Sequence, residues 1–252
     1  MVSPANSNPF HRHNLDHLSP SCLNTYASEK GFWCLKYLFG FKDSGPSMWR
    51  GLAVEAGFDA YLYGDRSDNH GRALDRFDLE ACGLCDDATL RERDKVPVML
   101  QRACADATTH GLQSQPILRQ FPIEYWFEGI EVPIIGVIDY EWEDFGLDLK
   151  TASRMPSKIP DGHARQVSLY RAARKKPYKL YYVTETKSSL RELTDEETKT
   201  HLKRLEWQAH AVRRVLSMFP DKNDIAQIFV PDFDHFFWKS DEAKIAAAEV
   251  WK

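Results

Sequence analysis

The middle of the chain alternates short apolar runs with polar positions in a way that predicts a β-hairpin. The apolar runs Ile134–Tyr140 and Phe145–Lys150 flank the acidic link Glu141–Asp144. Runs of this length on either side of a polar link predict two strands of one antiparallel sheet. Asp148 and Lys150 are two residues apart in the second run, so their side chains are expected on one face of the sheet.

The expected hairpin carries acidic side chains where a half-buried sheet normally carries apolar ones. Asp139 lies towards the end of the first run, whereas Leu147 and Leu149 of the second run point away from Asp148 towards a core. Close carboxylates repel one another, and burying them without a partner is costly. Because a divalent cation between the two aspartates removes that repulsion, the pattern predicts a metal site.

The rest of the chain predicts helices on either side of a larger sheet. The start of a helix is expected at 18–26, and further helices are expected around 32–39, at 48–63, in two pieces within 73–109, and at 162–175, 195–219 and 241–252. Further strands are expected at 116–127, 178–183, 188–193 and 224–230. This order predicts an α/β (α+β) fold with a mixed central β-sheet flanked by helices. Residues 1–17, which include three histidines, are expected to form a flexible tail. Residues 18–252 are expected to form a single domain with a helical insertion at about 64–112.

Composition and charge restrict the class of protein. The chain has 252 residues, of which 43% are hydrophobic and 28% charged, which is ordinary for a globular protein. It has no apolar run long enough to span a membrane and no signal-peptide pattern at its start. Its five cysteines are an odd number and favour reduced thiols. We therefore expect an intracellular protein, located in the cytoplasm.

The net charge of −4 gives no overall attraction to nucleic acid, so a phosphate-binding surface must be local. Basic residues are concentrated after the hairpin, at Lys158, Arg165, Arg171, Arg174, Lys175, Lys176, Lys179, Lys187 and Arg191. A solvated helix face explains this concentration as well as phosphate contact does. The candidate phosphate-binding residues are Arg50, Arg154, Arg165 and Arg174. We find no zinc finger, helix-turn-helix or other element that reads bases.

Glu55 is the other acidic residue in an unusual setting. It lies in the expected helix 48–63, capped by Ser47, with Leu52 and Phe58 as neighbours one turn away. A glutamate in apolar surroundings is either paired with a basic group or directed into a functional site. The helix alone favours the two interpretations equally.

The same acidic residues and the lysine suggest one kind of chemistry. Carboxylate ligands select a hard cation, Mg²⁺ or Mn²⁺, and the backbone carbonyl of Leu149 can add a further oxygen. Such an ion polarises a phosphoryl oxygen and lowers the pKa of a bound water. Lys150 can hold that water or stabilise negative charge on the phosphate. With Asp139, Asp148 and Glu55, these groups suit metal-assisted hydrolysis of a phosphodiester.

At this point the chain resembles the PD-(D/E)XK nucleases, in the branch of RecB-type nuclease domains and phage lambda-type exonucleases. Trp49-Arg-Gly-Leu-Ala-Val-Glu55 is similar to the Gly-x-x-x-Glu helix of the first motif. Gly136-Val-Ile-Asp139 is similar to the Gly-x-x-Asp motif, and Asp148-Leu-Lys150 to the (Asp/Glu)-x-Lys motif. Gln166-Val-Ser-Leu-Tyr170 is similar to the Gln-x-x-x-Tyr motif. The match spans roughly residues 18 to 185 and implies a restriction-endonuclease-like core.

The resemblance also implies roles for individual residues. Asp139 and Asp148 would bind the metal, Lys150 would position or activate the water, and Glu55 would bind the metal directly or through water. Gln166 would contact the metal-bound water or Lys150. Some members hold an iron–sulfur cluster with three late cysteines. No cysteine follows Cys104 here, so we expect no such cluster.

Tyr170 would contact a phosphate or a catalytic side chain. The function implied is that of a Mg²⁺- or Mn²⁺-dependent exonuclease that cuts DNA without sequence preference, in phage or bacterial recombination, replication or repair. A single-strand annealing or recombination protein and a second copy of the chain are the expected partners besides DNA. The alternatives are a non-catalytic DNA-binding or interaction protein on a nuclease fold, and an endonuclease.

Overall fold

The computed structural model describes residues 8–112 and 114–252 of the chain. The helices before the sheet are α1 (Pro9–Arg12), α2 (Pro20–Ser28), α3 (Lys30–Trp33), the π-helical turn η2 (Cys34–Leu38), α4 (Pro46–Leu62), α5 (Asn69–Ala81) and α6 (Asp87–Ala107). The strands are β1 (Leu118–Tyr125), β2 (Ile134–Glu141), β3 (Gly146–Thr151), β4 (Tyr178–Val183) and β5 (Ser188–Glu192). The later helices are α7 (Asp161–Arg174), α8 (Asp195–Met218), α9 (Lys222–Ile228), the 3₁₀ turn η3 (Phe236–Trp238) and α10 (Asp241–Val250).

The five strands form one mixed sheet in the order β1-β2-β3-β4-β5. Strands β1, β2 and β3 pair antiparallel, β3 pairs parallel with β4, and β4 pairs antiparallel with β5. The parallel pair needs a crossover, which α7 supplies. This arrangement confirms the expected fold, a mixed central sheet flanked by helices.

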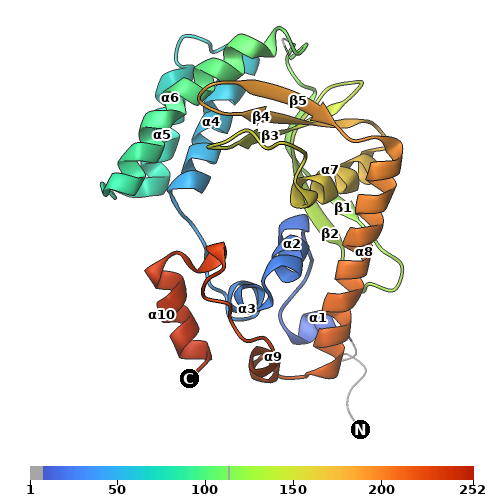
Figure 1. The fold of residues 1–252 in the computed structure, drawn as a ribbon. Coiled ribbons are helices and arrows are strands. Elements are labelled where there is room, and N and C mark those ends of the chain that lie inside the picture. The colour runs from blue at the N-terminus through green and yellow to red at the C-terminus, as the bar shows by residue number, and fades with distance from the viewer. Residues whose placement is uncertain (1–7, 113) are drawn as a thin grey trace.

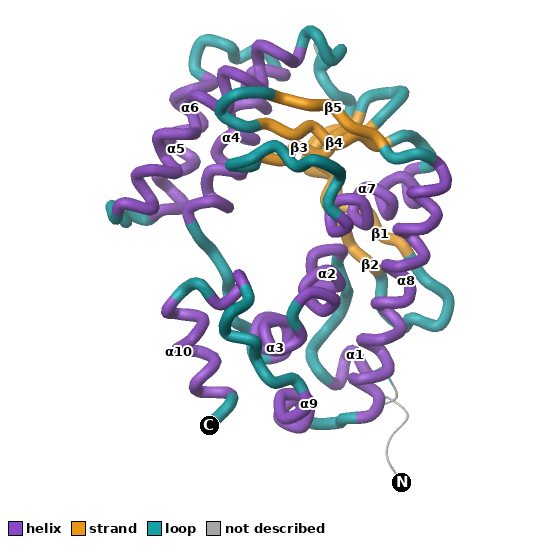
Figure 2. Tube along the Cα trace, in the orientation of Figure 1, coloured by secondary structure: helices purple, strands orange, loops and turns teal. Residues whose placement is uncertain are grey.

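Two hydrophobic cores lie on opposite faces of the sheet. Helices α4, α5 and α6 cover one face, and α7, α8 and α2 lie on the other, as the separated groups of helices in Figures 1 and 2 show. Leu147 and Leu149 of β3 belong to the core beneath α4, whereas Leu180 and Tyr182 of β4 belong to the core beneath α7. The alternation of side chains along these strands therefore separates the two cores.

Two glycines in the sheet allow tyrosine rings to lie directly on the backbone. A Cβ atom on Gly136 would lie 2.5 Å from Cε1 of Tyr170, and one on Gly146 would lie 2.0 Å from Cε1 of Tyr178. These distances exclude any larger residue without movement of the rings. Both glycines therefore fix the approach of the α7 and β4 aromatic residues to strands β2 and β3.

The buried carboxylate of Glu141 connects β2 to α7 and β4. Arg174 donates two hydrogen bonds to it, at 2.9 and 2.8 Å, Lys176 lies 3.0 Å away, and the Tyr178 hydroxyl also donates to it. Burial by itself would raise the pKa of Glu141, but these donors outweigh it and lower the pKa to about 2. These side chains form a structural ion cluster, and Arg174 is held within it.

The structure corrects several expectations about individual segments of the chain. Residues 8–17 are not a flexible tail, because α1 packs on the core and Phe10 is fully buried. Residues 1–7 of the expected tail lie outside the described part. Helix α4 begins at Pro46 with Gly45 as its N-cap, not Ser47. The strand expected at 224–230 is wrong, since α9 occupies this segment and its Ile225 packs as a helical residue against the core.

Among the described residues, none of the helices has the length and apolar character needed to cross a membrane.

Candidate active site

Strands β2 and β3 separate at the point where their acidic residues lie. Their paired positions are Tyr140 with Leu147 and Glu141 with Gly146. Beyond these pairs, Oδ2 of Asp139 accepts a hydrogen bond from the backbone N–H of Leu149 at 2.8 Å. The carboxylate of Asp139 therefore lies between the two strands and takes the place of a backbone acceptor.

The side-chain alternation of β2 changes face at Asp139. Ile134 and Ile138 pack in the core beneath α7, but Tyr140 packs in the core beneath α4, although all three are even-numbered positions. The next residue, Glu141, contacts Arg174 of α7. A regular strand cannot place residues two apart on opposite faces. The distortion at Asp139 directs its carboxylate into the plane of the sheet.

Asp148 and Lys150 form an ion pair on the α7 side of β3. Nζ of Lys150 lies 2.7 Å from Oδ2 of Asp148, whose side chain is completely buried. Apart from Lys150, no donor among the described residues bonds either oxygen of the Asp148 carboxylate. Burial would lower the pKa of Lys150, but the charges of Asp148, Asp139 and Glu55 outweigh it and raise the pKa. Lys150 is therefore a cation held beside acidic groups.

Glu55 of α4 approaches the same group of charges from the other face of the sheet. Burial, followed by repulsion from Asp148, raises the pKa of Glu55 to about 7. Burial and repulsion from Asp148 and Glu55 also raise the pKa of Asp139 well above its ordinary value. The structure thus brings Glu55, Asp139, Asp148 and Lys150 within electrostatic reach of one another.

Gln120 of β1 is a residue of this site that the sequence did not indicate. Its backbone has φ +45°, and the β1–β2 pairing passes from Arg119 to Phe121 without it. Its side-chain amide donates a hydrogen bond to Oε1 of Glu55. A glutamine with positive φ in a strand is uncommon and strained. The signal lies in backbone conformation, which the pattern of residues in β1 does not reveal.

A cleft of about 360 Å³ lies beside Glu55, between α4, α5 and β1. Its lining residues are Leu52, Glu55, Ala56, Asp59, Arg72, Arg76, Arg119, Gln120 and Tyr140. Arg119 pairs with Asp59 at 2.6 Å, and Arg76 pairs with Glu80 at 2.6 Å. The cleft therefore places both acidic and basic side chains next to Glu55.

Gln166 and Tyr170 of α7 form a chain of hydrogen bonds to β2. Nε2 of Gln166 donates to the Tyr170 hydroxyl at 2.7 Å, and this hydroxyl donates to the carbonyl of Val137 at 2.6 Å. Tyr170 is 1% exposed. In this arrangement its hydroxyl holds the strand that carries Asp139, and it is not open to a phosphate, because its ring packs against Gly136.

His163 of α7 is a second residue near the site that sequence reasoning missed. Its Nδ1 lies 2.8 Å from the hydroxyl of Tyr182. Burial and the positive charge of Lys150 lower the pKa of His163 to about 4. The imidazole is therefore neutral at physiological pH and accepts or donates one hydrogen bond within the α7 side of the site.

The four arginines expected to bind phosphate differ in their surroundings. Arg50 is buried and pairs with Glu92, and Arg174 is held by Glu141. Arg165 donates from Nε to Oδ1 of Asn24 at 2.6 Å. Arg154 is exposed in the loop between β3 and α7. Two of the four, Arg50 and Arg174, thus have acidic partners, of which Glu92 is partly buried and Glu141 fully buried, and this favours a structural role for both arginines.

The carboxylate and carbonyl oxygens of the site are the ligand type that a hard cation binds, but the described side chains are not grouped closely enough to form a metal site. Within residues 8–112 and 114–252, no three His, Cys, Asp or Glu side chains are grouped as a metal site. However, the buried oxygens of Asp148 have no donor other than Lys150 in the described part of the chain. The N–H and C=O of a strand residue project to the same edge. Since the N–H of Leu149 meets Asp139, its carbonyl is also directed to the gap between β2 and β3.

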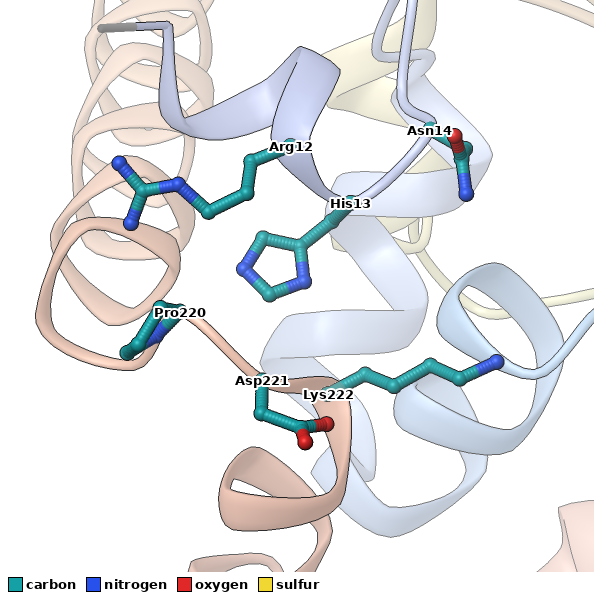
Figure 3. Close-up of a pocket in the computed structure, with 6 residues that line it drawn as sticks. All are labelled: Arg12, His13, Asn14, Pro220, Asp221 and Lys222. Carbon is teal, nitrogen blue, oxygen red and sulfur yellow. The ribbon is translucent and has the colours of Figure 1, made fainter. Parts of the chain in front are cut away.

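A separate pocket of about 370 Å³ lies where α1 meets the start of α9 (Figure 3). Nε2 of His13 lies 2.9 Å from the carbonyl of Phe219, and burial lowers the pKa of His13. His13 is therefore a packed residue and not part of a flexible tail. The remaining lining residues are Arg12, Asn14, Pro220, Asp221 and Lys222, none of which belongs to the Glu55 site.

Comparison with solved structures shows the fold. The crystal structure of a "putative exonuclease" from Eubacterium rectale aligns with a TM-score of 0.60 at 16% identity, over 86% of this chain and 87% of that chain. The structure of the protein SSO0001 aligns at 12% identity over 76% of this chain and 85% of that chain, but its TM-score of 0.34 is too low to indicate a shared fold. No protein-family model matches the chain, and no curated protein is similar to it.

Proposed function

We propose that this protein is a DNA nuclease that hydrolyses phosphodiester bonds with the help of Mg²⁺ or Mn²⁺. The observation that carries the proposal is the buried Asp148 carboxylate. It has Nζ of Lys150 at 2.7 Å, no other hydrogen-bond donor among the described residues, and acidic neighbours whose pKa values are raised. Such an excess of buried negative charge needs a cation. The fold shared with the Eubacterium rectale protein supports the same class.

In this proposal Asp139, Asp148 and the carbonyl of Leu149 would hold the cation, and Glu55 would bind it directly or through water. The cation, when bound, would polarise a phosphoryl oxygen and acidify a water. Lys150 orients the attacking water or meets the negative charge that develops on the phosphate. Asp139 also keeps β2 and β3 in register through the N–H of Leu149.

We further propose that the protein cuts DNA from an end and without sequence preference. The name of the Eubacterium rectale protein supports an exonuclease, although that name describes the other protein. The described residues contain no element of the kind that reads bases in the major groove. Because no recognition element accompanies the site, a sequence-specific endonuclease is the weaker alternative. A non-catalytic DNA-binding protein is weaker still, since it would not need the Asp148–Lys150 pair.

The test uses purified protein with linear duplex, circular duplex and single-stranded DNA, each with Mg²⁺, Mn²⁺ or EDTA. Metal-dependent shortening of linear DNA, with circles left intact, is the expected result. Nicked circles would indicate an endonuclease. Binding without cutting under every metal condition would overturn the nuclease proposal.

The matched variant is Lys150→Ala, with the exposed Lys199→Ala as control. Lys150→Ala is expected to abolish cleavage but to leave Mn²⁺ binding, measured by calorimetry, largely intact. Lys199→Ala is expected to cut at the wild-type rate. Wild-type turnover by Lys150→Ala would remove this lysine from the mechanism.

A further inference from the structure

An exposed tryptophan lies on α8, next to α7 and outside the Glu55 site. The side chain of Trp207 is 62% exposed, and Arg204 lies one turn before it on the same helix. A single exposed apolar residue is normal for a soluble protein. Here, however, Trp207 borders a hollow of about 460 Å³ between α7 and α8, lined by Asp161, Arg165, Arg204, Trp207, Gln208 and Ala211. We call this region the Trp207 hollow.

The Trp207 hollow carries excess positive charge. Nη1 of Arg204 lies 3.3 Å from Oδ2 of Asp161, and Nη1 of Arg165 lies 3.9 Å from the same oxygen. Two guanidinium groups therefore share one carboxylate. Asn24 of α2 accepts a hydrogen bond from Nε of Arg165 and thereby fixes the direction of this guanidinium group. The hollow thus offers a positioned cation to an anionic ligand beside a free aromatic surface.

Helix α7 connects the Trp207 hollow to the proposed catalytic site. Arg165 belongs to the hollow, and the next residue, Gln166, donates to the Tyr170 hydroxyl on the β2 side. Figure 1 shows α7 lying between the sheet and α8. A nucleic-acid strand that leaves the catalytic site over the start of α7 would therefore reach α8 within a short length.

We propose that the Trp207 hollow binds a single-stranded segment of nucleic acid, with one base stacked on Trp207 and phosphates held by Arg165 and Arg204. The inference rests on the proposed nuclease function and names the form of substrate that this surface prefers. Stacking on an aromatic side chain requires a base whose face is open, whereas bases within a duplex are covered by their neighbours. The combination of an indole with guanidinium groups is typical of single-strand binding.

The test measures binding to a fluorescently labelled oligothymidine and to a duplex of equal length, by anisotropy in EDTA so that no cutting occurs. Trp207→Ala is expected to weaken binding of the single strand by about 5- to 100-fold, the effect typical of one lost stacking contact. Binding of the duplex is expected to change less. Trp207→Tyr, which restores an aromatic face, is expected to recover part of the affinity.

Trp126→Ala is the matched control, because Trp126 is 58% exposed but does not line the Trp207 hollow. It is expected to bind the oligonucleotide as the wild type does. Equal binding by Trp207→Ala and Trp126→Ala, or wild-type protein that binds only duplex or only an added peptide partner, would overturn the proposal. Each of these outcomes leaves metal-dependent cutting of duplex DNA intact, so the two proposals fail separately.

Discussion

The carboxylate of Asp139 accepts the backbone N–H of Leu149 at 2.8 Å, so an acidic side chain of β2 holds the strand that carries Asp148 and Lys150. One residue therefore has a structural contact and a proposed metal contact. The two contributions can be separated, because the hydrogen bond needs an acceptor oxygen and the cation needs a negative charge.

Asp139→Asn is expected to keep the fold and lose the activity. An asparagine can still accept the N–H of Leu149, and it removes a buried charge that Asp148 and Glu55 repel. In EDTA its melting temperature should equal or exceed that of the wild type, while cleavage falls by about 100-fold or more. Asp139→Ala, which leaves the N–H without a partner, should in addition lose about 1–3 kcal/mol of stability. An Asn variant that cuts normally would exclude a metal role for Asp139.

Gln120 is expected to position Glu55 for catalysis. Gln120→Gly relieves the backbone strain of the positive φ (+45°) but removes the amide that donates to Glu55. Gln120→Ala removes the same amide and keeps the strain. Both variants should cut about 10-fold more slowly, as is typical when a partner of a metal-site residue is lost. Thermal melting should show Gln120→Gly to be the more stable of the two. Cleavage at the wild-type rate by both variants would show that Gln120 has no role in the site.

Gly136→Ala is expected to destabilise the protein by about 1–3 kcal/mol, since its Cβ would lie 2.5 Å from the Tyr170 ring. The ring cannot move freely, because its hydroxyl is bonded to Val137 and Gln166. Gly51→Ala in α4 is the control, because its Cβ would meet Thr151 at 3.5 Å, an ordinary contact. The control should be neutral or slightly stabilising. Equal free energies of unfolding for the two variants in urea denaturation would contradict this explanation.

Glu141→Gln is expected to lower the free energy of unfolding by about 2–3 kcal/mol at pH 7. Hydrogen bonds from Arg174, Tyr178 and Lys176 outweigh the effect of burial and lower the pKa of Glu141 to about 2 in the folded protein. The stabilisation is therefore present above the unfolded pKa, about 4.3, and is lost as the pH falls through about 2.

The difference between wild type and Glu141→Gln should accordingly shrink in urea titrations between pH 5 and pH 2. Glu143→Gln, at an exposed position two residues later, should match the wild type at each pH. A difference that is constant with pH would mean that the charge of Glu141 is not the source of its contribution.

Much of the architecture follows from local sequence. The apolar runs of β2, β3 and β4 and the helices from α4 to α8 lie close to their expected positions, because the local pattern of apolar and polar residues marks each of them. The segment at 224–230 is too short and mixed for its period to decide, and contact with the core makes it helix α9. The sequence likewise does not indicate that the start of the chain packs on the core, because α1 is only four residues long.

The candidate site divides in the same way. The sequence by itself determined that Asp148 and Lys150 share a face of β3 and that Glu55 lies on a helix, because spacing along one element sets these relations. Only the tertiary structure decided that β2 changes face at Asp139, that Gln120 reaches Glu55, and that Glu141 occupies Arg174. Those relations join elements far apart in the chain. They depend on strand distortion and on which charges meet, and neither is encoded in a local period.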